Sequence, residues 1–103
     1  MKPEAIVEAY LVKEIKRVGG IAYKFTSPNR RSVPDRMCVL PFGLVVFVEC
    51  KSAKGNMTVG QEREFNRLTN LSQLIFVVSS RAEVDELISA VLTIIAKRKE
   101  HKK

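Results

Sequence analysis

The fold is decided by the segment from Ser32 to Gln61, SVPDRMCVLPFGLVVFVECKSAKGNMTVGQ. Its centre, 41–43, is a Pro-Phe-Gly turn between two apolar runs at 36–40 and 44–51, and this pattern predicts a β-hairpin. The second run is almost wholly apolar, as expected for a central strand that is covered on both faces. One acid stands before the first run, and an acid and a lysine close the second, although burying an unpaired charge is costly.

The hairpin brings these charges together. If the turn centres on Phe42, Asp35 lies seven residues before it and Glu49 seven after it, so the two acids face each other unless a slip or a bulge changes the register. Cross-strand neighbours have Cβ atoms only ~4.5–5.5 Å apart. Glu49 and Lys51 are two residues apart and leave the same face of the strand. We therefore expect Asp35, Glu49 and Lys51 to converge at one end of the sheet.

Elements on both sides of the hairpin follow from hydrophobic spacing and from capping residues. Apolar residues recur at helical spacing from Pro3 until a glycine pair ends the helix. Two capping-box sequences, at Thr58 and Ser80, each open a later helix. The expected elements are a helix at 3–18, strands at 21–25, 36–40 and 44–51, a helix at 58–70, a strand at 74–78 and a helix from Ser80 onward. This order implies a mixed sheet between helices, with the fourth strand parallel to the third, and we expect Tyr10, Tyr23 and Phe65 in the core.

Two facing carboxylates repel each other when ionised, so both pKa values rise unless a cation lies between them. Oxygen ligands with room for water suit Mg²⁺ or Mn²⁺. Lys51 is placed to lower the pKa of an attacking water or to neutralise charge on a phosphoryl transition state. These parts predict hydrolysis of a phosphodiester. The plainer alternative is a strand-end ion pair between Glu49 and Lys51, but the facing acid and a basic loop beside it favour an active site.

The charge balance favours a polyphosphate partner. Eighteen basic residues outnumber eleven acids and give a formal net charge of +7, which is typical of domains that bind nucleic acid. For the basic tail at 97–103, a solubilising role and a nucleic-acid contact are equally open. The excess gathers in a central cluster (Lys24, Arg30, Arg31 and Arg36) and in that tail (Lys97, Arg98, Lys99, Lys102 and Lys103).

Several classes of protein are disfavoured. No apolar stretch approaches the ~20 residues of a membrane helix, and the N-terminus does not resemble a signal peptide. Cys38 and Cys50 are too few for a disulfide framework, and with a single histidine at 101 they fit no zinc pattern. We expect two buried, reduced cysteines in a cytoplasmic protein, and a chain of 103 residues that forms a single domain.

The residues Pro34-Asp35 and Glu49-Cys50-Lys51 resemble the PD-(D/E)XK nuclease signature. The longer stretch from Tyr23 to Gln61 resembles the VRR-NUC domain, the virus-type replication-repair nuclease, and the flanking helices extend the resemblance over nearly the whole chain. Its more specific elements are Arg-Arg-x-Val-Pro-Asp and a glutamine ten residues after Lys51. The resemblance implies a restriction-endonuclease-like α/β fold with an αβββαβα core and a mixed four-stranded sheet.

The resemblance also implies roles for single residues. Asp35, Glu49 and the backbone carbonyl of Cys50 would hold the metal, and Lys51 would position or activate the water. Gln61 would support the site from the following helix, although it also fits as the capping-box partner of Thr58. The first-helix acid of the family corresponds best to Glu8 and less well to Glu4, and both have a plain surface interpretation. The sequence departs from the family at Ser32, where glycine is usual and an unusual backbone angle is expected, and at Cys50, which replaces a larger aliphatic residue.

By the same resemblance, the substrate is branched DNA such as a four-way junction, cut by a homodimer with Mg²⁺ or Mn²⁺ and no small-molecule cofactor. A non-catalytic DNA-binding module of a replication or repair complex remains the main alternative, and an RNA-cleaving member of the superfamily is a third. The implied setting is the cytoplasm of a bacterium or a phage-infected host. The expected DNA contacts are Lys24, Ser27, Arg30, Arg31 and Arg36.

Overall fold

The central hairpin forms in the expected register. Strand β2 (Arg36–Leu40) pairs antiparallel with β3 (Leu44–Cys50), and Arg36 lies opposite Val48. The turn between them is a short 3₁₀ segment, η1 (Pro41–Gly43), in which Phe42 has φ 60° and Gly43 has φ 72°. Glycine adopts this left-handed backbone at no steric cost. This computed structural model describes residues 2–101 of the chain.

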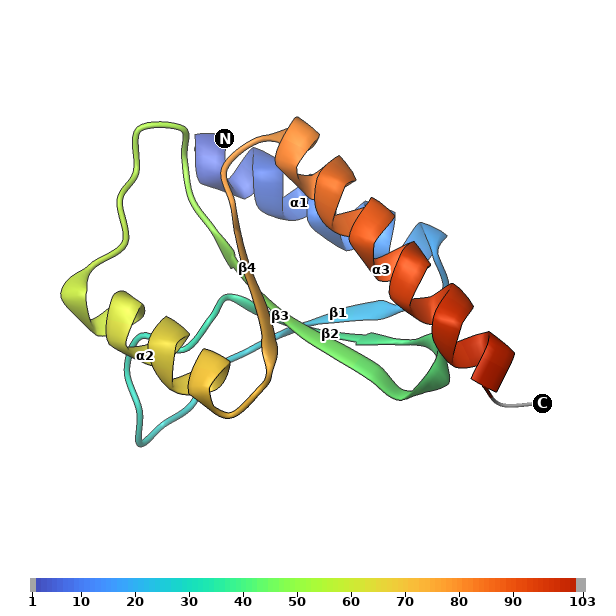
Figure 1. The fold of residues 1–103 in the computed structure, drawn as a ribbon. Coiled ribbons are helices and arrows are strands. Elements are labelled where there is room, and N and C mark those ends of the chain that lie inside the picture. The colour runs from blue at the N-terminus through green and yellow to red at the C-terminus, as the bar shows by residue number, and fades with distance from the viewer. Residues whose placement is uncertain (1, 102–103) are drawn as a thin grey trace.

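Two further strands complete a mixed sheet with the order β1-β2-β3-β4. Strand β1 (Ile21–Lys24) pairs antiparallel with β2, and β4 (Leu74–Val78) pairs parallel with β3. Helices α1 (Pro3–Arg17) and α3 (Arg81–His101) lie side by side against one face, while α2 (Val59–Asn70) lies apart from them beside the other end of the sheet (Figure 1). The expected αβββαβα order and the parallel fourth strand are both confirmed.

Local chemistry accounts for the helix ends. Pro3 occupies the first turn of α1, where its missing N–H costs nothing, and Gly19 follows the helix at φ 91°. Helix α2 opens with a complete capping box between Thr58 and Gln61. At α3 the Ser80 hydroxyl accepts a hydrogen bond from the Glu83 N–H at 3.1 Å.

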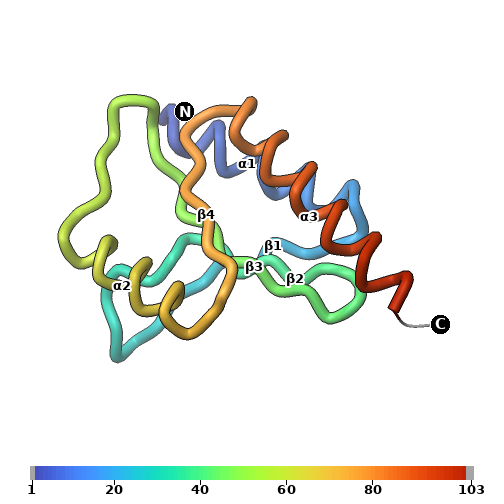
Figure 2. Tube along the Cα trace, in the orientation of Figure 1, coloured from blue at the N-terminus to red at the C-terminus, as the bar shows by residue number. Residues whose placement is uncertain are grey.

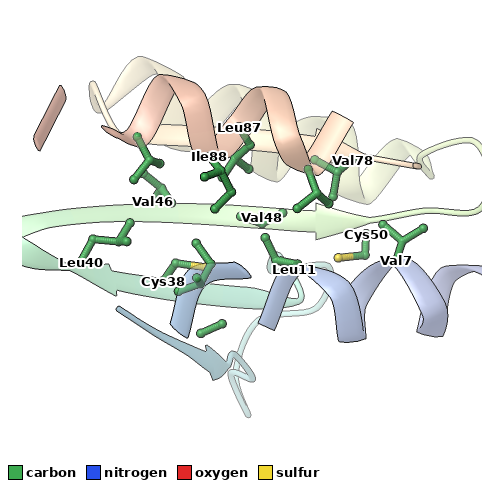
Figure 3. Close-up of a cluster of buried hydrophobic side chains, with 14 of the residues drawn as sticks. Val7, Leu11, Cys38, Leu40, Val46, Val48, Cys50, Val78, Leu87 and Ile88 are labelled. Atoms are coloured by element: carbon green, nitrogen blue, oxygen red, sulfur yellow. The ribbon is translucent and has the colours of Figure 1, made fainter. Parts of the chain in front are cut away.

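The core lies between the sheet and the pair α1 and α3. Alternate residues of β3 are buried here, so Val46 and Val48 pack against Leu11 of α1 and Ile88 of α3 (Figure 3). Full burial of such a side chain stabilises the fold by about 1.5–3 kcal/mol relative to exposure. Both cysteines belong to this core and are unpaired, and burial raises the pKa of each thiol to about 12. The expectation that both cysteines are buried is confirmed.

The opposite face of the sheet is only partly covered. Glu49 projects from this face and is buried beneath α2, with 4% of its surface exposed. Farther from α2 the face is open, and Ile21 and Tyr23 of the edge strand β1 are 54% and 49% exposed. The prediction that Tyr23 belongs to the core is therefore wrong, because nothing in residues 2–101 packs over the outer edge of β1. Tyr10 and Phe65 are half-buried.

The basic end of the chain lies far from α2. Residues 97–101 form the last turns of α3, at the opposite end of the molecule from α2 (Figure 2). There the Arg98 guanidinium donates a 3.2 Å hydrogen bond to the carbonyl of Phe42 at the hairpin turn. Lys102 and Lys103, the remainder of the predicted tail, lie outside the described residues. Across 2–101, every helix is too short or too polar to cross a membrane.

Candidate active site

Asp35 is held at the end of the sheet, just before β2. Its carboxylate oxygen Oδ2 accepts a 2.8 Å hydrogen bond from the backbone N–H of Cys50. Its backbone carbonyl accepts another from the N–H of Phe25 at 2.9 Å, which continues the β1–β2 pairing by one step. The register of the hairpin places Asp35 beside the last residues of β3, as the sequence predicts.

Glu49 and Lys51 meet at the same end of β3. The Lys51 ammonium lies 3.1 Å from Glu49 Oε2, and the side chains are only 15% and 6% exposed. The backbone N–H of Lys51 donates to the carbonyl of Val78 at 2.9 Å, so the strand geometry of β3 continues through the lysine. Asp35, Glu49 and Lys51 therefore converge.

Gln61 makes contacts that fit both of the roles that the sequence left open. Its side-chain oxygen accepts a 2.9 Å hydrogen bond from the N–H of Thr58, and its own N–H donates to the Thr58 hydroxyl at 3.1 Å. The amide nitrogen of the same side chain donates to Glu49 Oε2 at 2.7 Å. Gln61 thus couples the cap of α2 to the acid on β3.

The electrostatics of Glu49 would favour a bound cation. Burial raises the pKa of the Glu49 carboxyl above its ordinary value, and the negative charge of Asp35 raises it further. The hydrogen bond and the charge of Lys51 act in the opposite direction but do not cancel these effects. A divalent ion beside both acids would favour the ionised form and would remove their mutual repulsion.

The donor set at this end of the sheet suits a hard cation. The carboxylates of Asp35 and Glu49 supply oxygen ligands. Mg²⁺ is typically bound by one or two carboxylates, with water and phosphate completing the shell. Within residues 2–101, no three side chains of the His, Cys, Asp or Glu type cluster closely enough to form a metal site by themselves. Any ion bound here would therefore need ligands beyond the side chains of Asp35 and Glu49.

Glu8 has different partners from Asp35 and Glu49. Its Oε2 lies 2.7 Å from Arg36 Nε and 3.2 Å from the ammonium of Lys24. Arg36 also donates to the carbonyl of Ala22 at 3.0 Å. The alternation of side chains along β2 places Arg36 on the same face as Cys38, which is the face toward α1. Through its ion pair with Glu8, Arg36 links α1 to the sheet. Glu4, the less favoured alternative to Glu8, is exposed in the first turn of α1.

The loop between β1 and β2 carries the other predicted DNA contacts. The side chains of Arg30 and Arg31 are exposed, and the carbonyl of Ser27 accepts the N–H of Arg30 at 3.3 Å. Ser32 has φ 66°, the unusual angle expected at a position where the family has glycine. A methyl group added at Gly60 of α2 would lie 2.7 Å from the Ser32 hydroxyl, so this loop packs closely on the start of α2.

Sequence reasoning missed one buried acid beside these residues. Glu64 of α2 is 8% exposed, and it lines a small cavity with Glu49, Gln61 and Ser32. The space that the centre of a water molecule can occupy in this cavity is ≈ 10 Å³, which is roughly the room for one water. The only signal in the sequence is the three-residue spacing from Gln61, which places both side chains on one face of a helix.

Comparisons with known proteins agree with this fold. The chain matches no protein-family profile. It is 44% identical over 88 residues to a protein named "Putative nuclease p44" from Acyrthosiphon pisum secondary endosymbiont phage 1, covering 85% of this chain and 94% of the relative. It is also similar to a solved structure described as a VRR_NUC domain, with a TM-score of 0.82 and 31% identity over 86% of this chain and 97% of that one. The chain therefore belongs to the VRR-NUC family of nuclease domains.

Proposed function

We propose that this domain is an Mg²⁺- or Mn²⁺-dependent endonuclease that hydrolyses phosphodiester bonds in DNA and prefers branched substrates such as four-way junctions. The observation that carries the proposal is the buried Glu49 carboxylate, which lies beside Asp35 and is bound by Lys51 and Gln61. Burying a carboxylate beside a second acid is costly, and a cation bound by both acids would offset that cost.

We assign the metal to Asp35, Glu49 and the carbonyl of Cys50. The N–H and C=O of one residue in a strand point toward the same neighbouring strand. Because the Cys50 N–H meets the Asp35 carboxylate, the Cys50 carbonyl is also directed to that side, which supports its place in the ligand set. A divalent ion held there supplies positive charge next to the scissile phosphate.

The remaining residues orient this site and balance its charge. Lys51 is fixed by Glu49 at 3.1 Å, where an ammonium donates hydrogen bonds and stabilises the charge that develops on the phosphoryl oxygens. Gln61 and Lys51 both contact Oε2 of Glu49, and we assign the metal to the other carboxylate oxygen. Glu8 supports the site from α1 by orienting Lys24 and Arg36.

The basic loop supplies the DNA surface in this proposal. Arg30 and Arg31 are exposed beside the acids, and Ser27 stabilises the turn that presents them. Lys24 is 62% exposed and can reach phosphate, whereas Arg36 is 20% exposed and acts through Glu8. Phosphate contacts of this kind position a protein on DNA without reading its sequence, which fits selection by DNA shape.

A homodimer follows from the same reasoning. One chain has one such site, and cutting two strands or two arms of a junction needs two sites, which a symmetric dimer supplies. Light scattering at working concentration should give twice the mass of the single chain, and a monomer would contradict this part of the proposal.

The test of the activity is incubation with fork, flap, four-way-junction and linear DNA, each with Mn²⁺, with Mg²⁺ and with EDTA. We expect cleavage only with the metals, and most strongly on the junction. DNA binding without cleavage under every condition would favour a non-catalytic DNA-binding module instead. Cleavage of RNA substrates in a parallel panel would reveal an RNA-cleaving domain.

A further inference from the structure

Glu64 is an unusual residue for its helix. Helix α2 is mostly polar and exposed, and Glu64 is the one residue of the helix that is buried. Its side chain is only 10% exposed. A carboxylate is costly to remove from water unless it is paired, so its partners indicate what the burial achieves.

The carboxylate joins α2 to the arginine loop. Glu64 Oε1 lies 3.3 Å from Arg67 Nη1 on the same helix and 3.7 Å from Arg30 Nη1 on the loop between β1 and β2. Arg67 already neutralises the acid within the helix. The contact with Arg30 spans two elements, and it is an ion pair too long for a hydrogen bond.

A second contact fixes the same loop to the same helix. Ser32, at φ 66°, packs on Gly60, where an added methyl group would come within 2.7 Å of the serine hydroxyl. On α2, Gln61 and Glu64 are three residues apart and share a face. Gln61 holds the Glu49 carboxylate while Glu64 holds Arg30, and both line the cavity next to Glu49. One face of one helix therefore sets the position of Arg30 relative to the acid pair.

We infer that Glu64 is a positioning residue that fastens the arginine loop to α2 and directs Arg30 toward a phosphate of the substrate. The inference rests on the proposed DNA cleavage. Arg30 suits the task because its side chain is 53% exposed while one end touches Glu64. A guanidinium has five donors, so its outer N–H groups can bind a phosphate while the inner one stays beside the carboxylate.

The direction in which KM changes distinguishes a Glu64 that positions Arg30 from a Glu64 that merely repels the DNA. Glu64→Gln removes a negative charge near the DNA surface, and by charge alone this would strengthen DNA binding. If Glu64 positions Arg30, the variant weakens binding instead, and KM for a four-way junction rises about 2- to 5-fold while kcat changes little. In an Arg30→Ala background, the same substitution should no longer raise KM, because only the effect of the lost charge remains. Glu62→Gln removes an exposed acid from the same helix, so it is the matched control for the lost charge and should not raise KM.

A readout that does not depend on nuclease activity tests the loop directly. Trypsin cleaves after Arg30 and Arg31, and these sites should be cut several-fold faster in Glu64→Gln than in wild type or Glu62→Gln at equal thermal stability. If Glu64→Gln proves too unstable to study, Arg30→Ala, a change at an exposed side chain, should likewise accelerate cleavage after Arg31.

An unchanged trypsin pattern together with an unchanged or lowered KM would overturn the inference. Faster loop cleavage in a protein that cuts no DNA would support the attachment of the loop while refuting the proposed function, so the two failures are distinguishable.

Discussion

Gln61 Nε2 donates a 2.7 Å hydrogen bond to Glu49 Oε2, while the oxygen of the same amide accepts the N–H of Thr58 at the start of α2. A helix cap and an active-site contact thus share one side chain. The position of α2 over the sheet and the orientation of the buried acid are consequently linked, and a change at Gln61 affects both.

Two substitutions should separate the capping role of Gln61 from its contact with Glu49. Thr58→Ala removes only the hydroxyl that accepts the Gln61 N–H, so we expect a loss of about 1 kcal/mol in the free energy of unfolding with near-normal cleavage. Gln61→Ala also releases Glu49 and should lower cleavage about 10- to 100-fold, as is usual for residues that orient metal ligands. Urea unfolding and junction cleavage measure the two effects. Equal activity of both variants would show that the Glu49 contact is dispensable.

Lys51 should be essential for cleavage and not for folding. Lys51→Ala removes the one ammonium that contacts Glu49 in the described part of the chain, and we expect cleavage to fall about 100-fold or more, as for loss of a transition-state donor. DNA binding, measured by fluorescence anisotropy, should remain within a few-fold of wild type. Lys54→Ala, an exposed lysine in the following loop, is the control. Metal-dependent nicking that persists in Lys51→Ala would refute the assignment.

The raised pKa of Glu49 makes the stability of the metal-free protein depend on pH. Because burial and then Asp35 raise this pKa in the folded state, the folded protein holds a proton that the unfolded chain releases. The contribution of Glu49 is most favourable below the ordinary glutamate pKa and is lost as pH rises from there through the folded pKa. Glutamine cannot ionise, so Glu49→Gln should not lose this stability as pH rises. In EDTA, its melting temperature near neutral pH should therefore be higher than that of wild type.

Metal binding should follow the opposite trend with pH. A cation must displace the proton that the raised pKa of Glu49 retains, so the affinity for Mn²⁺ should increase as pH rises through that pKa. Calorimetric titration across this range measures it, with Asp35→Asn as the control that lacks one ligand. An affinity that is independent of pH would argue that Glu49 is not a ligand.

The ion pair between Arg36 and Glu8, which links α1 to the sheet, should contribute chiefly to stability. Arg36→Ala leaves Glu8 without its 2.7 Å partner and the Ala22 carbonyl without a donor. We expect a loss of about 1–3 kcal/mol in the free energy of unfolding. Arg31→Ala, at an exposed loop position, should change stability by less than about 0.5 kcal/mol but should weaken DNA binding. A stable Arg36→Ala protein with weakened DNA binding would instead make Arg36 a direct DNA contact.

The sequence alone accounts for the elements and for the meeting of three site residues. Hydrophobic periodicity, capping boxes and the turn at Phe42 are local features, and the strand period of two then determines which residues face each other. This is why Asp35, Glu49 and Lys51 are found where the hairpin register predicts. The parallel placement of β4 follows equally from the right-handed crossover rule.

Only the tertiary structure decides which of the other polar residues take part. The inward turn of Arg36 toward Glu8, the burial of Glu64 under the arginine loop and the exposure of Tyr23 depend on how α1 and α2 cover the sheet. These contacts join residues that are distant in the chain, and their energies depend on burial and on the direction of long side chains. A periodic pattern specifies which face a residue lies on, but the partner across that face is determined only when the elements pack.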